Sequence, residues 1–161
     1  MNLNLLILIL FTLSRIFELP FARANTQRLL RAGGREVAKG HYPLIVLLHG
    51  GWLASLWWLA PYRPINPPLL AILALVECAR IWVIGSLGRR WTTRIIIVPG
   101  EKLVTRGPYK FLNHPNYAVV IAEIALLPLV FGLWRVALLF TLLNAALLTI
   151  RIREENRALG R

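Results

Sequence analysis

Long apolar stretches constrain the fold of this chain more than any other feature of its sequence. The first runs from residue 3 to about residue 21 and stays uncharged until Arg15 and Glu18. A helix needs roughly 20 mostly apolar residues to cross the hydrocarbon core of a bilayer, which is about 30 Å thick. Further stretches of this kind cover approximately residues 42–60, 68–87, 117–131 and 134–150. The pattern predicts an all-α polytopic integral membrane protein with about five transmembrane helices, the last two forming a hairpin.

The composition excludes several other classes of protein. The chain is 57% hydrophobic and 16% charged, whereas a soluble domain is roughly 45–50% apolar and about 25% charged. A large soluble enzyme is therefore excluded. Cys78 is the single cysteine of the sequence, so neither a disulfide framework nor a cysteine-based zinc site can form within the chain. The sequence shows no other metal-ligand spacing, and we expect no metal.

The basic residues fall mainly on one side of the predicted membrane. With 19 Lys and Arg against 7 Asp and Glu, the net charge is +12. The excess lies in residues 22–41, 88–116 and 151–161, whereas the turns on the other side carry Arg63 and Arg135. The positive-inside rule places the long connections and the C-terminus in the cytoplasm and the N-terminus outside. We expect a bacterial-type inner membrane, membrane lipids as partners and no bound nucleic acid, because the charge forms no continuous groove.

The first apolar stretch also has some features of a secretory signal peptide. Residues 22–24 read Ala-Arg-Ala, like a cleavage site, but residues 1–4 lack the positive charge that signal peptides carry there. We therefore expect this stretch to be a retained transmembrane helix.

The connection over residues 88–116 is predicted to be a folded loop. Residues 94–98 form a short run rich in β-branched side chains, which ends at the turn dipeptide Pro99-Gly100. Gly107-Pro108 marks a second turn, and Pro115 is suited to the first position of a helix.

Three short motifs in the C-terminal half carry the most specific signal. They read Gly-Pro-Tyr at 107–109, Asn-His-Pro-Asn-Tyr at 113–117 and, one helical hairpin later, Arg-Ile-Arg-Glu-Glu at 151–155. Their order and spacing resemble the isoprenylcysteine carboxyl methyltransferase family of integral-membrane, S-adenosylmethionine-dependent methyltransferases. One difference is that Asn113 stands where many members have arginine. Residues 91–95 and Glu123 are similar to a bacterial branch that O-methylates long-chain alkylpyrones or alkylresorcinols.

The resemblance implies one membrane-embedded methyltransferase domain over residues 1–161, with its cofactor-binding half at about 85–161. It implies methyl transfer from S-adenosylmethionine to an oxygen of a lipophilic acceptor that enters from the inner leaflet, such as a prenylcysteine or a long-chain alkylpyrone. For the cofactor, the resemblance implies Leu103, Val104, Gly107, Pro108, Tyr109, His114, Pro115, Tyr117, Glu154 and Glu155. For the acceptor, it implies Trp91, Arg94 and Asn144.

The residue types in these motifs suit such a cofactor. Methyl transfer from a sulfonium needs alignment and a water-poor site rather than a metal. The cofactor's ammonium calls for a carboxylate, which Glu154 or Glu155 can supply, and its sulfonium favours an aromatic face, which Tyr109 or Tyr117 can supply. The alternative is that the glutamates form ion pairs on a solvated helix face and that the tyrosines belong to an interfacial aromatic belt.

Ionisable residues inside the spans are candidates for function, because their burial in a membrane is costly. Glu77 and Arg80 are three residues apart, and we expect them to pair with each other. Glu123 has no cation three or four residues away on its own helix, and His49 lies beside Gly50-Gly51. We regard Glu123 and His49 as candidates for a substrate cavity.

Arg151, Glu123 and His49 are the candidate catalytic residues, and they separate two classes of acceptor. A carboxylate is ionised at neutral pH and needs an arginine to orient it, such as Arg151 or Arg94. A phenol or enol must lose a proton to a positioned base, such as Glu123 or His49. With no arginine before His114 and no partner for Glu123 on its own helix, the sequence favours the hydroxyl acceptor.

Two other functions remain open at this point. An NADPH-dependent membrane reductase is one, because sterol-reductase-like proteins have similar Gly-Pro-Tyr and His-Pro patterns. A non-enzymatic small membrane protein, in which the buried charges only pair with one another, is the other.

Overall fold

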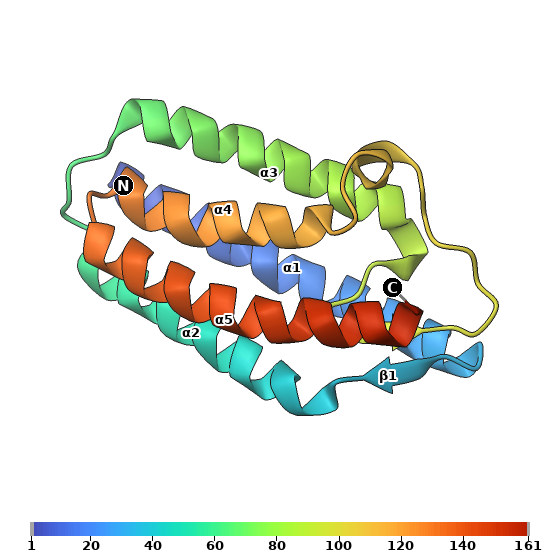
Figure 1. Cartoon of the computed structure of the whole chain (residues 1–161). Coiled ribbons are helices and arrows are strands. Elements are labelled where there is room, and N and C mark those ends of the chain that lie inside the picture. The colour runs from blue at the N-terminus through green and yellow to red at the C-terminus, as the bar shows by residue number, and fades with distance from the viewer. Residues whose placement is uncertain (1, 161) are drawn as a thin grey trace.

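Five α-helices lie side by side in the computed structural model, which describes residues 2–160 (Figure 1). They are α1 (Leu3–Arg31), α2 (Tyr42–Leu59), α3 (Pro67–Leu87), α4 (Pro115–Val130) and α5 (Trp134–Leu159). Within the described residues, four helices are long and apolar enough to cross a membrane, and α4 is a shorter apolar helix. The predicted all-α polytopic fold is confirmed. The expected domain limits, 1 and 161, fall on residues outside the described range.

The first and last helices extend well beyond the predicted spans. At 1.5 Å per residue, the 29 residues of α1 rise about 43 Å, more than the roughly 30 Å of a hydrocarbon core. The segment 151–159, expected to follow the last span, continues α5 without a break. Residues 131–133 connect α4 to α5, and the predicted hairpin is confirmed.

A small antiparallel ribbon joins the two long connections. It pairs β1 (Arg35–Val37) with β2 (Ile95–Ile97), with Glu36 opposite Ile96. The second strand confirms the β-branched run expected at 94–98, whereas its partner β1 was not predicted. The 3₁₀ turns η1 (Lys39–His41), η2 (Gly88–Arg90) and η3 (Gly107–Lys110) complete the connections. Pro108 lies in the first turn of η3 and Pro115 begins α4, as the sequence indicated.

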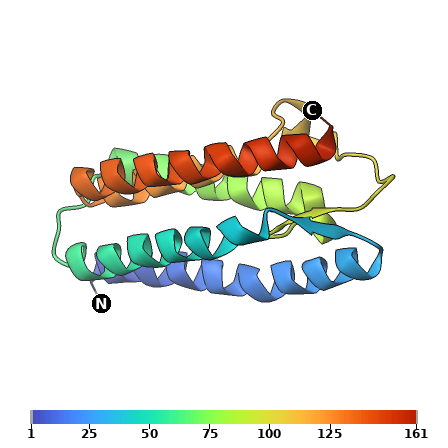
Figure 2. The same ribbon diagram turned by 60° about the horizontal axis from the view of Figure 1, so that its bottom comes forward.

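The two ends of the bundle differ in structure. The ribbon, the loop between α3 and α4 and the end of α5 gather at one end, whereas the short turns α2–α3 and α4–α5 lie at the other (Figures 1 and 2). The basic connections therefore share one end of the molecule, as the charge pattern predicts.

The core of the bundle is centred on α4. Ile124 and Leu127 are almost fully buried and pack with side chains from α1, α2 and α3. The indole of Trp52 donates a hydrogen bond to the Ile124 carbonyl oxygen at 3.2 Å and packs edge-on against Phe11. Outward-facing residues are also apolar, and Trp58 is 85% exposed. Apolar side chains inside and outside are expected for helices surrounded by lipid.

A network of ion pairs crosses the bundle between α1, α3 and α4. Arg80 contacts Glu18 at 2.6 Å and Glu123 at 3.0 Å. Arg15 contacts Glu77, and its guanidinium lies 3.4 Å from Glu123. All five groups thus have a partner of opposite charge.

This network corrects two predictions. The expected pair of Glu77 with Arg80 is wrong, because each residue pairs instead with a charge on another helix. Glu123, for which its own helix offers no cation, is bound by Arg80 and Arg15 from neighbouring helices. Arginine side chains are long enough to reach across a helix interface, and spacing along one helix does not reveal such partners.

Candidate active site

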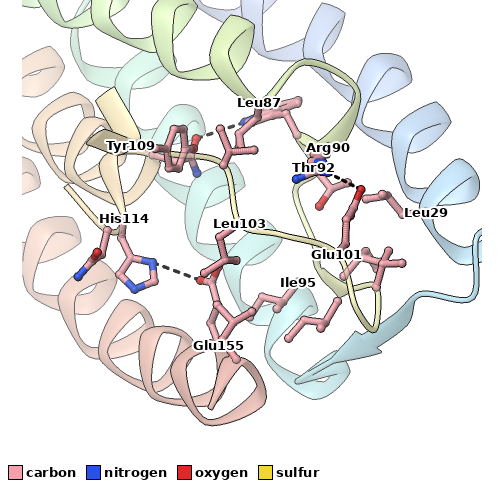
Figure 3. Close-up of a pocket in the computed structure, with 18 of the residues that line it drawn as sticks. Leu29, Leu87, Arg90, Thr92, Ile95, Glu101, Leu103, Tyr109, His114 and Glu155 are labelled. Atoms are coloured by element: carbon pink, nitrogen blue, oxygen red, sulfur yellow. Dashed lines mark hydrogen bonds and ion pairs between the residues drawn. The ribbon is translucent and has the colours of Figure 1, made fainter. Parts of the chain in front are cut away.

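A cavity of about 310 Å³ lies at the basic end of the bundle. Its walls come from the end of α1, the loop between α3 and α4, the start of α4 and the end of α5 (Figure 3). The volume falls in the range of ligand-binding pockets. More than half of the predicted site residues line this cavity: Trp91, Arg94, Leu103, Val104, Tyr109, His114, Tyr117, Arg151 and Glu155.

The polar wall of the cavity joins the start of α4 to the end of α5. The Tyr117 hydroxyl donates a hydrogen bond to Glu155 Oε2 at 2.5 Å, and Arg151 Nε donates to the same hydroxyl oxygen at 2.9 Å. His114 Nδ1 lies 3.5 Å from Glu155 Oε2. The rings of His114 and Tyr117 are stacked, with centroids 5.3 Å apart. The wall therefore combines one carboxylate, one guanidinium and two aromatic rings.

Helix geometry explains why these residues meet. Arg151 and Glu155 are four residues apart on α5 and share one face. His114 directly precedes Pro115, which starts α4, and Tyr117 lies in the first turn of this helix, where the two rings stack. The segment before α4 and the last turns of α5 thus present their polar side chains to each other.

Glu154 and Glu155, both predicted to bind the cofactor, are separated by the structure. Successive residues of an α-helix point about 100° apart. Glu155 lines the cavity, whereas Glu154 lies outside the lining and pairs with the exposed Arg157 at 2.8 Å. Of the two, Glu155 is the one placed to meet a ligand.

The loop between α3 and α4 supplies further lining residues. Leu103 and Val104 offer apolar side chains, and Tyr109 enters from η3 (Figure 3). Burial raises the pKa of the Tyr109 phenol above its usual value, and the negative charge of Glu155 adds to the effect. Tyr109 therefore presents a neutral ring to the cavity.

Trp91 and Arg94 are anchored by contacts outside the cavity. Trp91 is 2% exposed and stacks on Phe21, with ring centroids 6.0 Å apart. Arg94 lies over the Tyr42 ring at 4.4 Å and contacts Glu36 at 2.8 Å. These contacts tie the cavity wall to α1, α2 and β1.

The other predicted site residues lie outside the cavity lining. Gly107, Pro108 and Pro115 shape η3 and the start of α4. His49 Nδ1 is 2.8 Å from the Ile45 carbonyl oxygen, one turn earlier on α2. Asn144 is 2% exposed on α5. Glu123 belongs to the ion-pair network.

Some lining residues were not predicted. Asn116 accepts a hydrogen bond from the Trp91 indole at 3.3 Å. It lies inside the 113–117 motif, so the motif offered a reason to include it among the site residues. Arg90 and Glu101 form an ion pair of 2.6 Å across the loop (Figure 3). The sequence offered no means of pairing these two residues. Among residues 2–160, no group of three or more His, Cys, Asp or Glu side chains could hold a metal ion.

Comparison with known proteins agrees with the motifs. The isoprenylcysteine carboxyl methyltransferase (ICMT) family matches residues 69–161, which include every motif of the cavity. The uncharacterized protein YpbQ of Bacillus subtilis (strain 168) is 38% identical over 96% of this chain and 95% of its own length. An uncharacterized protein of Haemophilus influenzae is 31% identical over 56% of this chain and 54% of its own. No solved structure matches the chain. The chain belongs to the ICMT family, a family of membrane methyltransferases.

Proposed function

We propose that the cavity binds S-adenosylmethionine and that the protein transfers its methyl group to an oxygen of a lipophilic acceptor dissolved in the membrane. One observation carries the proposal. The neighbouring motifs at 107–109 and 113–117 and the motif at 151–155, one helical hairpin later, each contribute side chains to a single cavity. Membership of a methyltransferase family supports the reaction class.

The donor set of the cavity fits this cofactor. The Glu155 carboxylate can accept hydrogen bonds from an ammonium group. The faces of Tyr109 and of the stacked His114 and Tyr117 rings can hold a sulfonium cation by cation–π attraction. Leu103 and Val104 offer an apolar surface to a purine. When bound, S-adenosylmethionine supplies an electrophilic methyl group on its sulfonium.

The chain's own contribution is orientation and exclusion of water. Tyr117 holds Glu155 Oε2 in place, and Arg151 holds Tyr117, so the carboxylate is positioned before a ligand arrives. A second hydrogen bond from Arg151, to the Thr93 carbonyl oxygen at 2.8 Å, ties α5 to the loop. Preorganised polar groups in a partly buried site favour binding because little reorganisation is needed.

The geometry favours an anionic acceptor oxygen. Arg94 and Arg151 line the cavity, whereas Glu123 and His49 lie outside its lining. The sequence favoured a hydroxyl acceptor for two reasons, the lack of an arginine before His114 and the lack of a partner for Glu123 on its own helix. The contacts of Glu123 with Arg80 and Arg15 remove the second reason. A carboxylate such as that of a prenylcysteine is already ionised at neutral pH and needs no base.

We also infer that the cavity faces the cytoplasm and that the N-terminus is outside. The ribbon, the loop between α3 and α4 and the end of α5 lie together, and they carry most of the Lys and Arg residues (Figure 1). The positive-inside rule assigns such an end to the cytoplasm. Lipophilic acceptors would then approach from the inner leaflet.

A transfer assay tests this function. Purified protein in lipid nanodiscs is mixed with methyl-labelled S-adenosylmethionine and a prenylcysteine, a long-chain alkylpyrone or an alkylresorcinol, and label is counted in the organic phase. We expect label in the prenylcysteine, a strong loss in Glu155→Gln and near wild-type transfer in Glu154→Gln. Label in the hydroxyl acceptors alone would contradict the anionic acceptor. Transfer to none of them, with NADPH binding in place of the methyl donor, would contradict the whole proposal.

A further inference from the structure

The loop that contains η3 packs against the last turns of α3. Arg106 Nε donates a hydrogen bond to the Ser86 carbonyl oxygen at 3.0 Å. The Gly107 backbone lies directly against the Ser86 side chain and near the Trp82 indole. Figure 1 shows this loop beside the C-terminal end of α3. The start of this loop therefore lies level with the last turns of α3, a helix long and apolar enough to cross a membrane.

The short length of α4 also indicates the depth of the loop that precedes it. Its 16 residues rise about 24 Å, less than the roughly 30 Å of a hydrocarbon core. The C-terminal end of α4 is level with the start of α3, because the Asn66 N–H donates to the Val130 carbonyl oxygen at 2.8 Å. The 21 residues of α3 rise farther than α4 does. The chain just before Pro115 must then occupy the depth that α4 leaves uncovered.

The backbone of this loop suits an apolar environment, in which each N–H needs an internal partner. The Tyr109 N–H donates to the Arg106 carbonyl oxygen at 3.3 Å. The Phe111 and Leu112 N–H groups both donate to the Pro108 carbonyl oxygen at 3.1 Å. Pro108 itself has no N–H. Non-helical backbone can therefore lie at this level without unpaired donors at these positions.

The side chains of the loop point to lipid as the contacting partner. Phe111 is 74% exposed and Leu112 is 53% exposed. The exposed cations Arg106 and Lys110 precede this apolar pair, and Lys110 Nζ lies 6.0 Å from the Phe111 ring centroid. Apolar side chains beside cations are typical of segments that lie in a membrane interface, where the cations reach the phosphates.

We propose that residues 106–112 form an interfacial anchor in the leaflet at the basic end of the bundle. Phe111 and Leu112 insert among the acyl chains just below the phosphates of phospholipids, and Lys110 and Arg106 contact those phosphates. Tyr109 belongs to the same turn and lines the cavity. The anchor thus fixes one wall of the cavity relative to the membrane, whatever ligand the cavity binds.

Spin labels at single cysteines test this proposal. On a Cys78→Ala background, labels are placed by Phe111→Cys and Leu112→Cys. The acyl-chain reference is Leu75→Cys, which is 70% exposed on α3, and the aqueous reference is Ala158→Cys, exposed near the end of α5. Each protein is reconstituted into vesicles of phosphatidylcholine and phosphatidylglycerol. Collision rates with oxygen, which concentrates in the acyl region, and with a water-soluble nickel chelate are then measured.

We expect labels at 111 and 112 to favour oxygen over the nickel chelate, as at 75 and opposite to 158. Since both positions are exposed, their substitution leaves the packing of the bundle in place, and an unchanged thermal transition confirms it. Labels at 111 and 112 that behave like the label at 158 would overturn the anchor. This result would leave the proposed function untouched, because methyl-donor binding does not enter the measurement.

Discussion

The Tyr117 hydroxyl lies 2.5 Å from Glu155 Oε2 and links the first turn of α4 to the last turns of α5. The two residues are 38 positions apart in the sequence, yet both face the cavity. Arg151 Nε, bound to the same hydroxyl, completes a chain of three side chains. The carboxylate proposed to receive the cofactor's ammonium is thus held by a residue from a different helix.

Replacement of Tyr117 should weaken methyl-donor binding without unfolding the protein. A hydrogen bond to a charged group contributes about 1.5–3 kcal/mol, so Tyr117→Phe should raise the Kd for S-adenosylhomocysteine roughly 10- to 100-fold. Titration calorimetry measures this change. Tyr42→Phe is the matched control, because the Tyr42 hydroxyl contacts Thr93 at 3.3 Å outside the main cavity. Equal effects of the two substitutions would argue against a positioning role for Tyr117.

The buried ion pairs should contribute strongly to stability when one partner is removed. Arg80→Met leaves Glu18 and Glu123 without their closest cation, and loss of one partner of a buried pair costs about 3–5 kcal/mol. Thermal unfolding in detergent should show a marked drop in Tm. Arg157→Met is the control, because it breaks the exposed pair with Glu154, and such pairs contribute about 0–1 kcal/mol. Similar Tm values for the two variants would contradict the structural role of the network.

Gly107 should tolerate no side chain. Its φ is +59°, a left-handed conformation, and a Cβ there would overlap Ser86 Oγ. Gly107→Ala should lower the Tm and weaken ligand binding, because the shift of η3 moves Tyr109. Gly100→Ala is the matched control, with φ +77° but nothing within 4 Å of a Cβ. The difference between the two variants isolates the contact with α3, and identical Tm values would mean that this contact is unimportant.

Stability should fall at alkaline pH through Tyr109. Burial raises the pKa of its phenol above the usual 10.0, so the folded protein keeps a proton that the unfolded chain loses. The resulting stability is fully present below about pH 10 and is lost as pH rises beyond it. The free energy of unfolding should therefore decline less steeply above pH 10 in Tyr109→Phe than in the wild type. Parallel curves would contradict this, and Tyr62→Phe, 96% exposed, serves as the control.

Much of the fold could be predicted because its signals are local. Apolar stretches of sufficient length predict membrane helices whatever their neighbours. Pro115 marks the start of α4, and the isoleucines at 95–97 predict a strand. The partner strand at 35–37 was not predictable, since its sequence Arg-Glu-Val carries no pattern of its own. A C-terminal helix was expected after residue 150, but its continuity with the last span was not, because the apolar stretch ends at the membrane surface while the helix continues.

The sequence grouped many of the residues that line the cavity, but it did not give their geometry. His114 and Tyr117, which the motif placed near each other in sequence, have stacked rings. Glu155 lines the cavity and Glu154 does not, because of the way that α5 packs against α4. Helix packing of this kind cannot be read from the local sequence. The cations that pair with Glu123 come from α1 and α3. The lack of a cation on its own helix therefore did not mean that Glu123 is unpaired. Long-range pairing of charges is set by helix packing, which local spacing does not encode.

Calorimetric binding of S-adenosylmethionine to the purified protein tests the central claim most directly. Wild type, Glu155→Gln and Glu154→Gln are titrated in the same detergent, with NADPH as the rival ligand. We predict saturable binding of the methyl donor, a Kd raised at least tenfold in Glu155→Gln and little change in Glu154→Gln, whose side chain lies outside the cavity lining. Absence of binding, or equal affinities in the two variants, would contradict the assignment of this cavity to the methyl donor.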